Sequence, residues 1–329
     1  MNQKKNKINI GINGCGRIAK CLIRMLDKHD NLNLVSINHY NTCVKINDVL
    51  KYIKYDTIHG RYILKNKSFY IHHYKNPSEI PWEKEIDIII DTTGKFKTKQ
   101  KLESHIKYPH QKVLLSCPSE EIFMYIYGIN HYLIALEKPN IFSGASCTTN
   151  ASSPILKILD DNWEIVNCFL TTIHSNTSSN NIVDRINLES NRKGFSGNYN
   201  IIPSSTGASK AISKINPKLL GKVNAVSYRV PTINVSIIEL CVNLNKKTTI
   251  SKILNKFREL SDNNYKDIIE VNDENLVSSC FIGNSNSSII DSHHCQELGN
   301  KFFKIVIWYD NEWGYSNNLI NLIKFTMNN

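Results

Sequence analysis

The chain has 329 residues, which is enough for two domains. Its 41% hydrophobic and 21% charged residues are typical of a globular protein, and no apolar run is long enough to span a membrane. The formal net charge is +11. The lysines are spread along the chain without interleaved aromatic residues, which argues against a nucleic acid as partner.

The cysteines and the start of the chain predict the compartment. Nine cysteines, an odd number, occur without C-x-x-C spacing, which indicates reduced thiols rather than a disulfide framework. Residues 1–7 contain lysines but no apolar run follows them, so we expect no secretory signal. We therefore expect a cytoplasmic protein that does not associate with membranes.

A glycine-rich turn follows the first predicted strand. Residues 8–13 are typical of a buried strand, and Gly14 and Gly16 follow, with Ala19 at the third small position of the motif. Apolar residues then recur at helical spacing, and residues 32–37 predict a second strand. Strand, glycine-rich turn, helix and strand in this order predict dinucleotide binding, with the pyrophosphate at the helix N-terminus.

The residue after the second strand departs from the usual pattern. An Asp or Glu is expected there to accept hydrogen bonds from the adenosine ribose, and the chain has His39 instead. A carboxylate at this position also repels the 2′-phosphate of NADP, and His39 offers a donor in its place. Two predictions compete: weakened NAD binding, or tolerance of NADP.

Strands and helices continue to alternate. Residues 86–91 and 112–116 predict buried strands of a parallel sheet, and residues 100–107 predict a helix between them. The carboxyl ends of such strands form the edge at which ligands bind. The residues expected at this edge are Thr93, Gly94 and Ser116.

A cysteine and a histidine form a candidate catalytic pair. The predicted strand 141–145 delivers Cys147 to the same edge, facing the cofactor, and His174 follows 27 positions later. Residues 152–159 predict the next helix, with Pro154 in its first turn. A thiol near a helix N-terminus and an imidazole has a lowered pKa, and the thiolate is the reactive nucleophile.

Seven motifs, spread over the whole chain, occur together. They are Ile12-Asn13-Gly14-x-Gly16-Arg17-Ile18, Lys54-Tyr55-Asp56-Thr57-x-His59-Gly60, residues 145–150, Thr171-Thr172-Ile173-His174, residues 201–203 with 205–208, Arg229-Val230-Pro231-Thr232 and residues 308–315. In this order they resemble the phosphorylating glyceraldehyde-3-phosphate dehydrogenase family.

The resemblance implies the fold and the assembly. It implies an α/β protein with a Rossmann-type doubly wound parallel sheet in residues 1–147, completed by a C-terminal helix in residues 314–329. Residues 148–313 would form a mixed α/β catalytic domain with a large antiparallel sheet. The family is typically a homotetramer.

The resemblance also implies the chemistry. Cys147 would attack the aldehyde carbon of glyceraldehyde 3-phosphate to give a thiohemiacetal, and His174 would take the hydroxyl proton as hydride leaves for NAD. The Cys147 backbone N–H and His174 would stabilise the oxyanion. Inorganic phosphate would then attack the thioester to give 1,3-bisphosphoglycerate, a reaction of glycolysis and gluconeogenesis.

Binding residues are carried over by the same resemblance. Arg229 and Thr177 match the site for the substrate phosphate, and Asn311 matches the residue that holds the nicotinamide carboxamide. The inorganic-phosphate site is matched by Ser146, Thr148, Thr206 and Gly207. The remaining cofactor residues are Asn13, Gly14, Gly16, Arg17, Ile18, His39, Thr93, Gly94 and Ser116.

The departures from the family pattern cluster in one loop. Residues 191–197 stand where an Arg-Arg-x-Arg segment usually reaches a neighbouring subunit's cofactor, and the stretch is one residue longer. Lys193 keeps a charge where an anion-binding arginine aligns, but it loses the planar bidentate fork. Phosphate affinity and subunit contacts are therefore open at this loop. Ala151 replaces a second cysteine that is common in the family.

Two histidine clusters contain metal-binding residue types. Residues 291–295 hold Asp291, two histidines and Cys295, and His72 and His73 are adjacent. Neighbouring residues of a strand point to opposite faces, and no second ligand pair follows at zinc spacing. We interpret both clusters as surface turns and expect no metal.

The sequence leaves two alternatives to a phosphorylating glyceraldehyde-3-phosphate dehydrogenase. Thr232-Ile233-Asn234 resembles erythrose-4-phosphate dehydrogenase, a relative that resolves the thioester with water, whereas residues 205–208 resemble the phosphorylating enzyme. A protein with a mainly binding role is the second alternative, with His39 and the altered loop as signs of impaired cofactor binding. Against it, the set Cys147, His174, Arg229 and Asn311 is complete.

Overall fold

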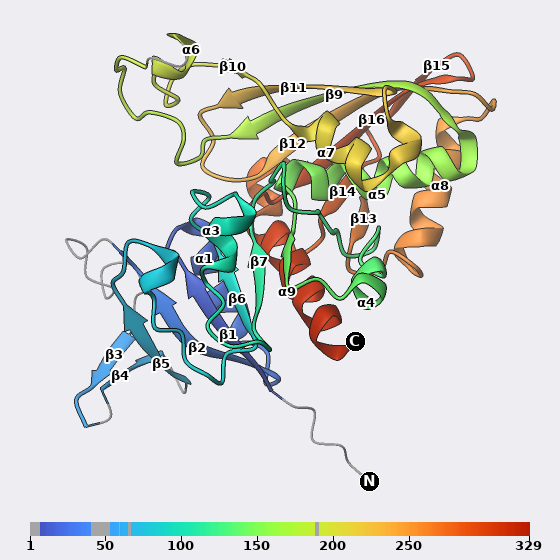
Figure 1. Cartoon of the computed structure of the whole chain (residues 1–329). Coiled ribbons are helices and arrows are strands. Elements are labelled where there is room, and N and C mark those ends of the chain that lie inside the picture. Colours follow the sequence, from blue (N-terminus) through green and yellow to red (C-terminus); the bar gives the residue numbers. More distant parts are fainter. Residues whose placement is uncertain (1–6, 41–52, 59, 65–66, 188–190) are drawn as a thin grey trace. The chain divides into compact units, whose positions relative to one another are not determined.

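The computed structural model describes residues 7–40, 53–58, 60–64, 67–187 and 191–329 (Figure 1). His59 of the motif in residues 54–60 and residues 1–6 lie outside this part of the chain. The chain divides into two compact units. The first contains residues 1–127, 131–145 and 319–329, and the second contains residues 128–130 and 146–318.

The first unit is built on an eight-stranded sheet in the order β3-β4-β5-β2-β1-β6-β7-β8. The strands are β1 (Ile8–Asn13), β2 (Leu32–Asn38), β3 (Ile53–Asp56), β4 (Arg61–Leu64), β5 (Lys67–His72), β6 (Ile88–Asp91), β7 (Lys112–Leu115) and β8 (Ile141–Ser143). All pairs from β5 to β8 are parallel, and β3 and β4 add an antiparallel hairpin beside β5. The predicted parallel sheet is confirmed.

The apolar run of β6 explains why this sheet is covered on both faces. Ile88, Ile89 and Ile90 are all fully buried, which is typical of a strand between two layers of helices. Among its described residues, the first unit has the helices α1 (Arg17–Leu26), α3 (Lys99–Glu103), α4 (Leu133–Glu137), the 3₁₀ turn η1 (Pro77–Glu79) and the later part of α9 (Trp313–Asn328).

One predicted helix is shorter than expected. We predicted a helix over residues 100–107, and α3 ends at Glu103. Its continuation is made of tight turns, in which His105 N bonds to Leu102 O and Ile106 N bonds to Glu103 O. Tyr108 precedes a proline, and that position disfavours the helical conformation.

The second unit holds another sheet of eight strands. The order along the main path is β10-β11-β9-β12-β16-β14-β13, and β15 pairs with β16. The strands are β9 (Ile165–Ser175), β10 (Ile202–Ser204), β11 (Val223–Val230), β12 (Ser236–Leu244), β13 (Ile269–Asn272), β14 (Ser288–Asp291), β15 (Gln296–Leu298) and β16 (Phe302–Tyr309). The centre is antiparallel as predicted, but β11 pairs with β9, and β13 with β14, in parallel.

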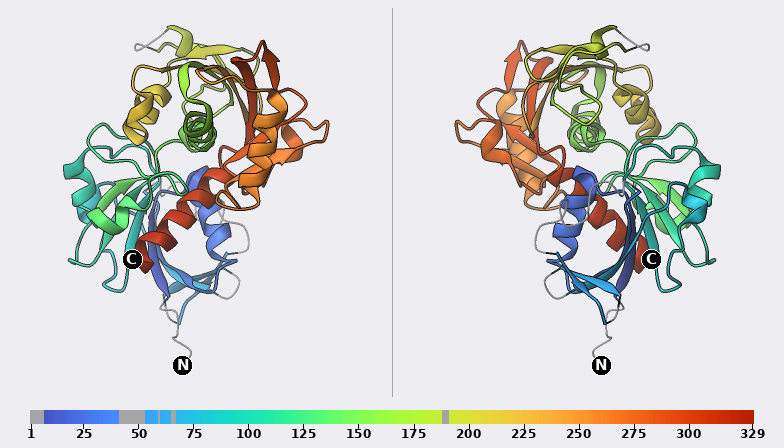
Figure 2. Two further views of the ribbon diagram at one scale, coloured as in Figure 1. Left: turned by 90° about the vertical axis from the view of Figure 1, so that its right-hand side faces the viewer. Right: turned by 90° about the vertical axis from the view of Figure 1, so that its left-hand side faces the viewer.

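Helix α5 packs on the buried face of this sheet, where it contacts β9, β12, β14 and β16 (Figure 2). Strand β12 alternates in burial, and Ile238, Leu240 and Val242 point into the core. The described part of the second unit has the helices α5 (Cys147–Trp163), α6 (Asn191–Gly194), α7 (Ala208–Ile215), α8 (Ile250–Ser261), the first part of α9 and the 3₁₀ turns η2 (Pro217–Leu219) and η3 (Ser278–Phe281).

Helix α5 corrects a second prediction. It begins at Cys147, five residues before the predicted start at residue 152, so Pro154 lies inside the helix and not in its first turn. The prediction was wrong because Thr148, Thr149 and Asn150, which are small polar residues, were not recognised as helical. Their side chains are buried, so tertiary packing overrides their weak helix propensity.

No helix in the described part of the chain combines the length and the apolar character needed to cross a bilayer.

Candidate active site

Cys147 is the first residue of helix α5. The chain enters the helix through Ala145, which has a positive φ of 57°, and Ser146 then caps it. The Ser146 Oγ accepts a hydrogen bond from Thr149 N at 3.1 Å, which satisfies one of the free N–H groups of the first turn. The thiol therefore lies at the positive end of a helix of 17 residues.

The structure brings Cys147 and His174 together. His174 lies near the end of β9 and is 3% exposed, and its Nε2 is 3.4 Å from the Cys147 Sγ. This distance is within the range for a hydrogen bond to sulfur, so a proton can pass between the thiol and the imidazole. The pair separated by 27 residues in the sequence is a contact in the fold.

The electrostatic surroundings of the thiol differ from expectation. Burial raises the pKa of Cys147 above its ordinary value, and this effect outweighs the Arg229 charge and the hydrogen bonds at Thr148 and Cys147, which lower the pKa. Our prediction of a lowered pKa is therefore wrong for this structure. His174 is the adjacent group that can take the thiol proton.

Arg229 lies on the other side of the imidazole. Strands β9 and β11 run parallel with His174 and Arg229 in register, and the Arg229 Nη1 is 2.6 Å from His174 Nδ1. The Ser175 carbonyl oxygen lies 2.8 Å from the same Nδ1 and 3.2 Å from Nη1. A guanidinium only donates, so Nδ1 accepts from Arg229 when the ring proton is on Nε2.

The alternative tautomer is the one that suits a base. When Nδ1 carries the proton and donates to the Ser175 carbonyl oxygen, Nε2 becomes an acceptor that faces the thiol. Arg229 and a protonated Nδ1 would then present two donors to each other. An anion that draws Arg229 away from the imidazole therefore favours the tautomer in which His174 can accept a proton.

Two serines that the sequence reading did not single out hold Asn311. The Ser175 Oγ and the Ser236 Oγ each donate to Asn311 Oδ1 at 2.9 Å, and Ser236 Oγ also accepts from Ser175 N. Asn311 is 4% exposed. The two hydroxyls fix the orientation of its amide, so that the Nδ2 group points away from them. No spacing in the sequence links these residues, which come from three different segments.

Tyr309 is a further residue that was missed. Its hydroxyl lies 3.1 Å from Thr148 Oγ1 and 2.8 Å from Thr172 Oγ1, and its ring meets the His174 ring edge to face at 6.0 Å. Tyr309 is buried, and it stands in the quoted motif of residues 308–315. Thr148, a predicted phosphate residue, is thereby bonded to a neighbouring hydroxyl in this structure.

The other predicted anion-binding residues have local contacts. Thr177 Oγ1 lies 3.0 Å from Ser179 Oγ, and Thr206 Oγ1 accepts from Ala208 N at 3.2 Å. Gly207 is the N-cap of α7. Lys193 lies in α6 with an exposed side chain, and its carbonyl oxygen accepts from Asn181 Nδ2 at 2.8 Å.

The glycine-rich turn of the first unit fits a dinucleotide. Gly14 has φ of 109°, and a Cβ there would lie 2.5 Å from Thr92 Oγ1, so only glycine suits the position. Gly16 is the N-cap of α1 without a side-chain cap, and a Cβ on it would meet no atom within 4 Å. The first turn of α1 therefore has backbone N–H groups beside an open space, which suits a pyrophosphate.

The remaining predicted cofactor residues surround the same edge of the first sheet. Arg17 and Ile18 begin α1, and Gly94 has φ of 65° with open space around it. Thr93 and Ser116 follow β6 and β7, where Ser116 N bonds to Asp91 O. His39 follows β2 directly, and its carbonyl oxygen is 2.7 Å from His73 Nδ1.

The histidine clusters have structural partners. Residues 292–294 form a turn, where His294 Nδ1 lies 3.1 Å from the buried Asp291 carboxylate, which also accepts from Trp308 Nε1. His72 is not in a surface turn as predicted, because it ends β5 and lies 2.9 Å from Glu83 Oε1. The described residues contain no group of three or more His, Cys, Asp or Glu side chains that could hold a metal.

Comparison with known families covers both units. The profile "Glyceraldehyde 3-phosphate dehydrogenase, NAD binding domain" matches residues 8–99, and the profile "Glyceraldehyde 3-phosphate dehydrogenase, C-terminal domain" matches residues 146–311. The second match spans the thiol, His174, Arg229 and Asn311. The chain belongs to the glyceraldehyde-3-phosphate dehydrogenase family.

Curated relatives match over nearly the whole chain. The cytosolic glyceraldehyde-3-phosphate dehydrogenase of Craterostigma plantagineum is 37% identical over 332 residues, covering 97% of this chain and 98% of that protein. The cytosolic enzyme of Pisum sativum is 38% identical over 331 residues, covering 96% and 97%. The enzyme of Mastigamoeba balamuthi is 38% identical over 332 residues, covering 95% and 97%.

Membership of this family makes the chain an NAD-dependent oxidoreductase. The predicted family and the predicted enzyme class are thus confirmed. The profile named for NAD binding covers the glycine-rich turn and helix α1, the part of the first unit whose geometry fits a dinucleotide.

Proposed function

We propose that this protein oxidises glyceraldehyde 3-phosphate to 1,3-bisphosphoglycerate, with NAD as the hydride acceptor and inorganic phosphate as the second substrate. The observation that carries the proposal is the 3.4 Å contact between Cys147 Sγ and His174 Nε2 at the N-terminus of α5. The proposed oxidation of an aldehyde needs a nucleophile in contact with a base.

The first step is the attack of the Cys147 sulfur on the aldehyde carbon. The thiol proton passes to His174 Nε2, and the carbonyl oxygen becomes an oxyanion that the N-terminus of α5 stabilises. His174 Nε2 returns this proton to the oxyanion, which gives the hydroxyl of the thiohemiacetal and a neutral imidazole. The same Nε2 then takes the hydroxyl proton again as hydride leaves the carbon. NAD, when bound, supplies the acceptor for this hydride. The product on Cys147 is a thioester, which inorganic phosphate cleaves.

Arg229 connects substrate binding to the state of the base. We propose that the substrate phosphate draws the Arg229 guanidinium from its position 2.6 Å from His174 Nδ1. Nδ1 then holds the ring proton against the Ser175 carbonyl oxygen, and Nε2 is the acceptor. His174 thus becomes a base when substrate is present.

The other anion and cofactor contacts are proposed from the family pattern. Thr177 joins Arg229 at the substrate phosphate, and Ser146, Thr148, Thr206, Gly207 and Lys193 serve inorganic phosphate. Asn311 would offer its oriented amide to the nicotinamide carboxamide, supported by the two serines that hold its oxygen. We assign the first unit to dinucleotide binding and the second to catalysis, with the boundaries near residues 147 and 313.

An apolar face supports the proposed homotetramer. Phe169 and Ile173 on β9 lie on the face of the second sheet opposite the core, next to Val226 and Tyr228 on β11. Phe169 is 64% exposed. A contiguous apolar face of this kind is typical of an interface, and a second copy of the chain is the proposed partner. The names of the cytosolic relatives support a cytoplasmic location.

NADP is the second cofactor candidate, favoured by the structure around His39. His39 directly follows β2, His73 lies against its backbone, and residues 38–40 and 72–74 contain no carboxylate. A 2′-phosphate would therefore meet imidazole donors without the usual repulsion. His39→Asp should raise the ratio of kcat/KM for NAD over NADP by about tenfold, which corresponds to about 1.4 kcal/mol.

One set of assays tests the reaction. NADH and NADPH formation is followed with glyceraldehyde 3-phosphate and with erythrose 4-phosphate, each with and without inorganic phosphate. We expect turnover of the three-carbon substrate that depends on phosphate. Phosphate-independent turnover of the four-carbon sugar would instead identify an erythrose-4-phosphate dehydrogenase, and a strong preference for NAD would eliminate the NADP candidate.

A further inference from the structure

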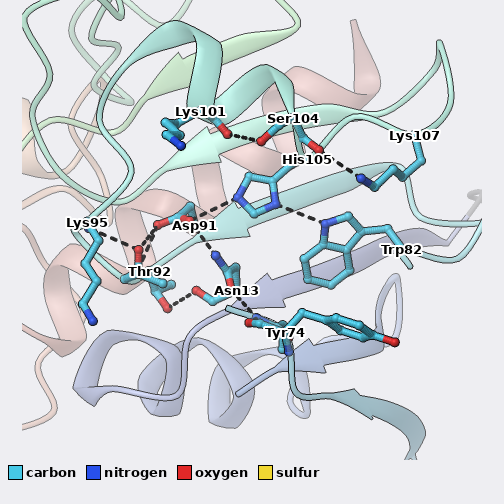
Figure 3. A network of polar contacts seen from close by, with 12 residues as sticks. Asn13, Tyr74, Trp82, Asp91, Thr92, Lys95, Lys101, Ser104, His105 and Lys107 are labelled. Atoms are coloured by element: carbon cyan, nitrogen blue, oxygen red, sulfur yellow. Dashed lines mark hydrogen bonds and ion pairs between the residues drawn. The ribbon is translucent and has the colours of Figure 1, made fainter. Parts of the chain in front are cut away.

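A buried polar network lies behind the cofactor edge of the first sheet (Figure 3). Its centre is Asp91, the last residue of β6, which is fully buried. The Asp91 Oδ2 accepts from Asn13 Nδ2 at 2.8 Å, and Oδ1 accepts from Thr93 N at 3.0 Å and Thr93 Oγ1 at 2.7 Å. A buried carboxylate is tolerated only where donors surround it in this way.

His105 and Trp82 complete the network behind the carboxylate. In Figure 3 the His105 ring lies between Asp91 and Trp82. The Trp82 Nε1 donates to His105 Nδ1 at 3.1 Å, and His105 Nε2 is 3.2 Å from Asp91 Oδ2. An indole N–H only donates, so Nδ1 must accept and the ring proton must be on Nε2, where it donates to Asp91. The tautomer of His105 is thereby fixed by its two partners.

The network reaches the dinucleotide turn through Asn13. The Asn13 Oδ1 accepts from Asn38 Nδ2 at 2.8 Å, so its amide is held between Asn38 on one side and Asp91 on the other. The Thr92 Oγ1 donates to Asn13 O at 2.8 Å, and Gly14 N donates to Asn38 O at 2.9 Å. The ends of β1, β2 and β6 are thus joined at the start of the glycine-rich turn.

We infer that His105 and Trp82 are positioning residues for NAD binding, which act through Asp91 on Asn13 and Thr93. His105 is fully buried and Trp82 is 2% exposed, so neither is placed to touch the cofactor. Their hydrogen bonds set the direction of the Asp91 carboxylate, and the carboxylate sets the amide of Asn13 and the turn at Thr93. The inference rests on NAD binding by the first unit.

Two substitutions of His105 separate hydrogen bonding from packing. H105F fills the space but leaves the Trp82 N–H without its acceptor and removes the His105 donor from Asp91 Oδ2, which keeps Asn13. H105Q offers an amide oxygen to Trp82 and an NH₂ group to Asp91, and so restores both bonds. We expect H105F to raise the Kd of NAD about tenfold, as measured by calorimetry on the full-length protein, and H105Q to raise it less than about threefold.

Tyr125→Phe is the matched control. It removes the hydrogen bond between the buried Tyr125 hydroxyl and Glu137 in the same unit, away from the glycine-rich turn. We expect it to lower the thermal midpoint while the Kd of NAD stays at the wild-type value. A wild-type Kd in H105F, with only a lowered midpoint, would make His105 a core residue and overturn the inference. Equal loss in H105F and H105Q would overturn it as well.

Trp82→Phe decides the question if H105F does not fold. This change frees His105 Nδ1 from its donor, so the ring can adopt the other tautomer and turn its lone pair toward Asp91. We expect the ¹⁵N signals of the His105 ring to show a mixed tautomer and the Kd of NAD to rise about threefold. A single unchanged tautomer with an unchanged Kd contradicts the inference. Failure of the wild-type chain to bind NAD would instead count against the cofactor assignment itself.

Discussion

Two strands of this chain end at polar side chains to which we assign different roles. Strand β6 ends at Asp91, which is buried behind the sheet edge and acts on its surroundings through hydrogen bonds. Strand β9 ends beside His174, whose ring contacts the Cys147 sulfur directly. In the proposed function, the backbone of a glycine-rich turn in the first unit binds the dinucleotide, and buried side chains shape that turn. In the second unit the side chains themselves would react.

This difference predicts which substitutions should change cofactor binding and which should change turnover. A substitution at the thiol site should lower turnover but leave the glycine-rich turn unchanged, because the thiol site and the turn belong to different units. A change at the turn weakens cofactor binding through backbone geometry.

Cys147→Ser should abolish turnover and spare cofactor binding. A serine hydroxyl is a far weaker nucleophile at neutral pH, so we expect kcat/KM for the aldehyde to fall by roughly 10⁴ or more. The Kd of NAD should change less than about threefold. Cys280→Ser, at an exposed thiol in the same unit, is the control and should keep full activity.

The same measurement addresses the alternative of a binding protein. If the wild-type chain oxidises neither aldehyde with NAD or NADP, the thiol has no catalytic role and the binding alternative is favoured. Retention of activity in Cys147→Ser would show that another group is the nucleophile.

Arg229→Gln should act on substrate affinity and on the thiol. Loss of a charged hydrogen bond to the substrate phosphate is worth about 1.5–3 kcal/mol, so we expect KM for the aldehyde to rise roughly 10–100-fold. The Arg229 charge also lowers the pKa of Cys147, so its removal raises that pKa further. Alkylation by iodoacetamide requires the thiolate and should therefore begin at higher pH in the variant.

Arg258→Gln provides the control for charge alone. Arg258 lies in α8 of the second unit and pairs with Asp273 on the surface. Its loss should leave the KM and the pH profile of alkylation unchanged. A shift of the Arg229→Gln profile to lower pH would contradict the proposed influence of Arg229 on the thiol.

Gly14→Ala and Gly16→Ala should distinguish folding from binding at the turn. Alanine at Gly14 must adopt φ of 109° and contact Thr92 Oγ1, so we expect a loss of about 1–3 kcal/mol in the free energy of unfolding. Gly16 has φ of −77°, so alanine there should cost less than about 1 kcal/mol.

Both variants should bind NAD about tenfold more weakly, for different reasons. In Gly14→Ala the turn is displaced, whereas in Gly16→Ala the added methyl group occupies the open space beside the first turn of α1. Urea denaturation gives the first quantity and calorimetry gives the second. An unchanged Kd in Gly16→Ala would mean that the pyrophosphate does not approach this glycine.

Much of the first unit was readable from local pattern. Continuous apolar runs predicted β1, β2, β6 and β7, and the glycines predicted the turn before α1. These features depend on residues next to one another in the chain. The α3 and α5 boundaries were wrong because turns and burial decide where those helices end or begin. The antiparallel hairpin of β3 and β4 was not predicted.

The surroundings of Cys147 and His174 show what the sequence did not predict. Cys147 and His174 were recognised through their motifs, and their contact agrees with that reading. Ser175, Ser236 and Tyr309 were not recognised, because hydroxyl residues are common and nothing in their spacing predicts that they meet. The raised pKa of Cys147 was also missed, since it results from burial by distant parts of the chain.

The sequence by itself determined the family and the α/β class and predicted Cys147 as the reactive thiol, because these depend on residue types in fixed order. Only the tertiary structure decided which groups surround them. It placed Arg229 against His174 through the parallel pairing of β11 with β9, and it buried Asp91 with His105 and Trp82 behind the cofactor edge. Such contacts join segments far apart in the chain, and only packing brings them within bonding distance.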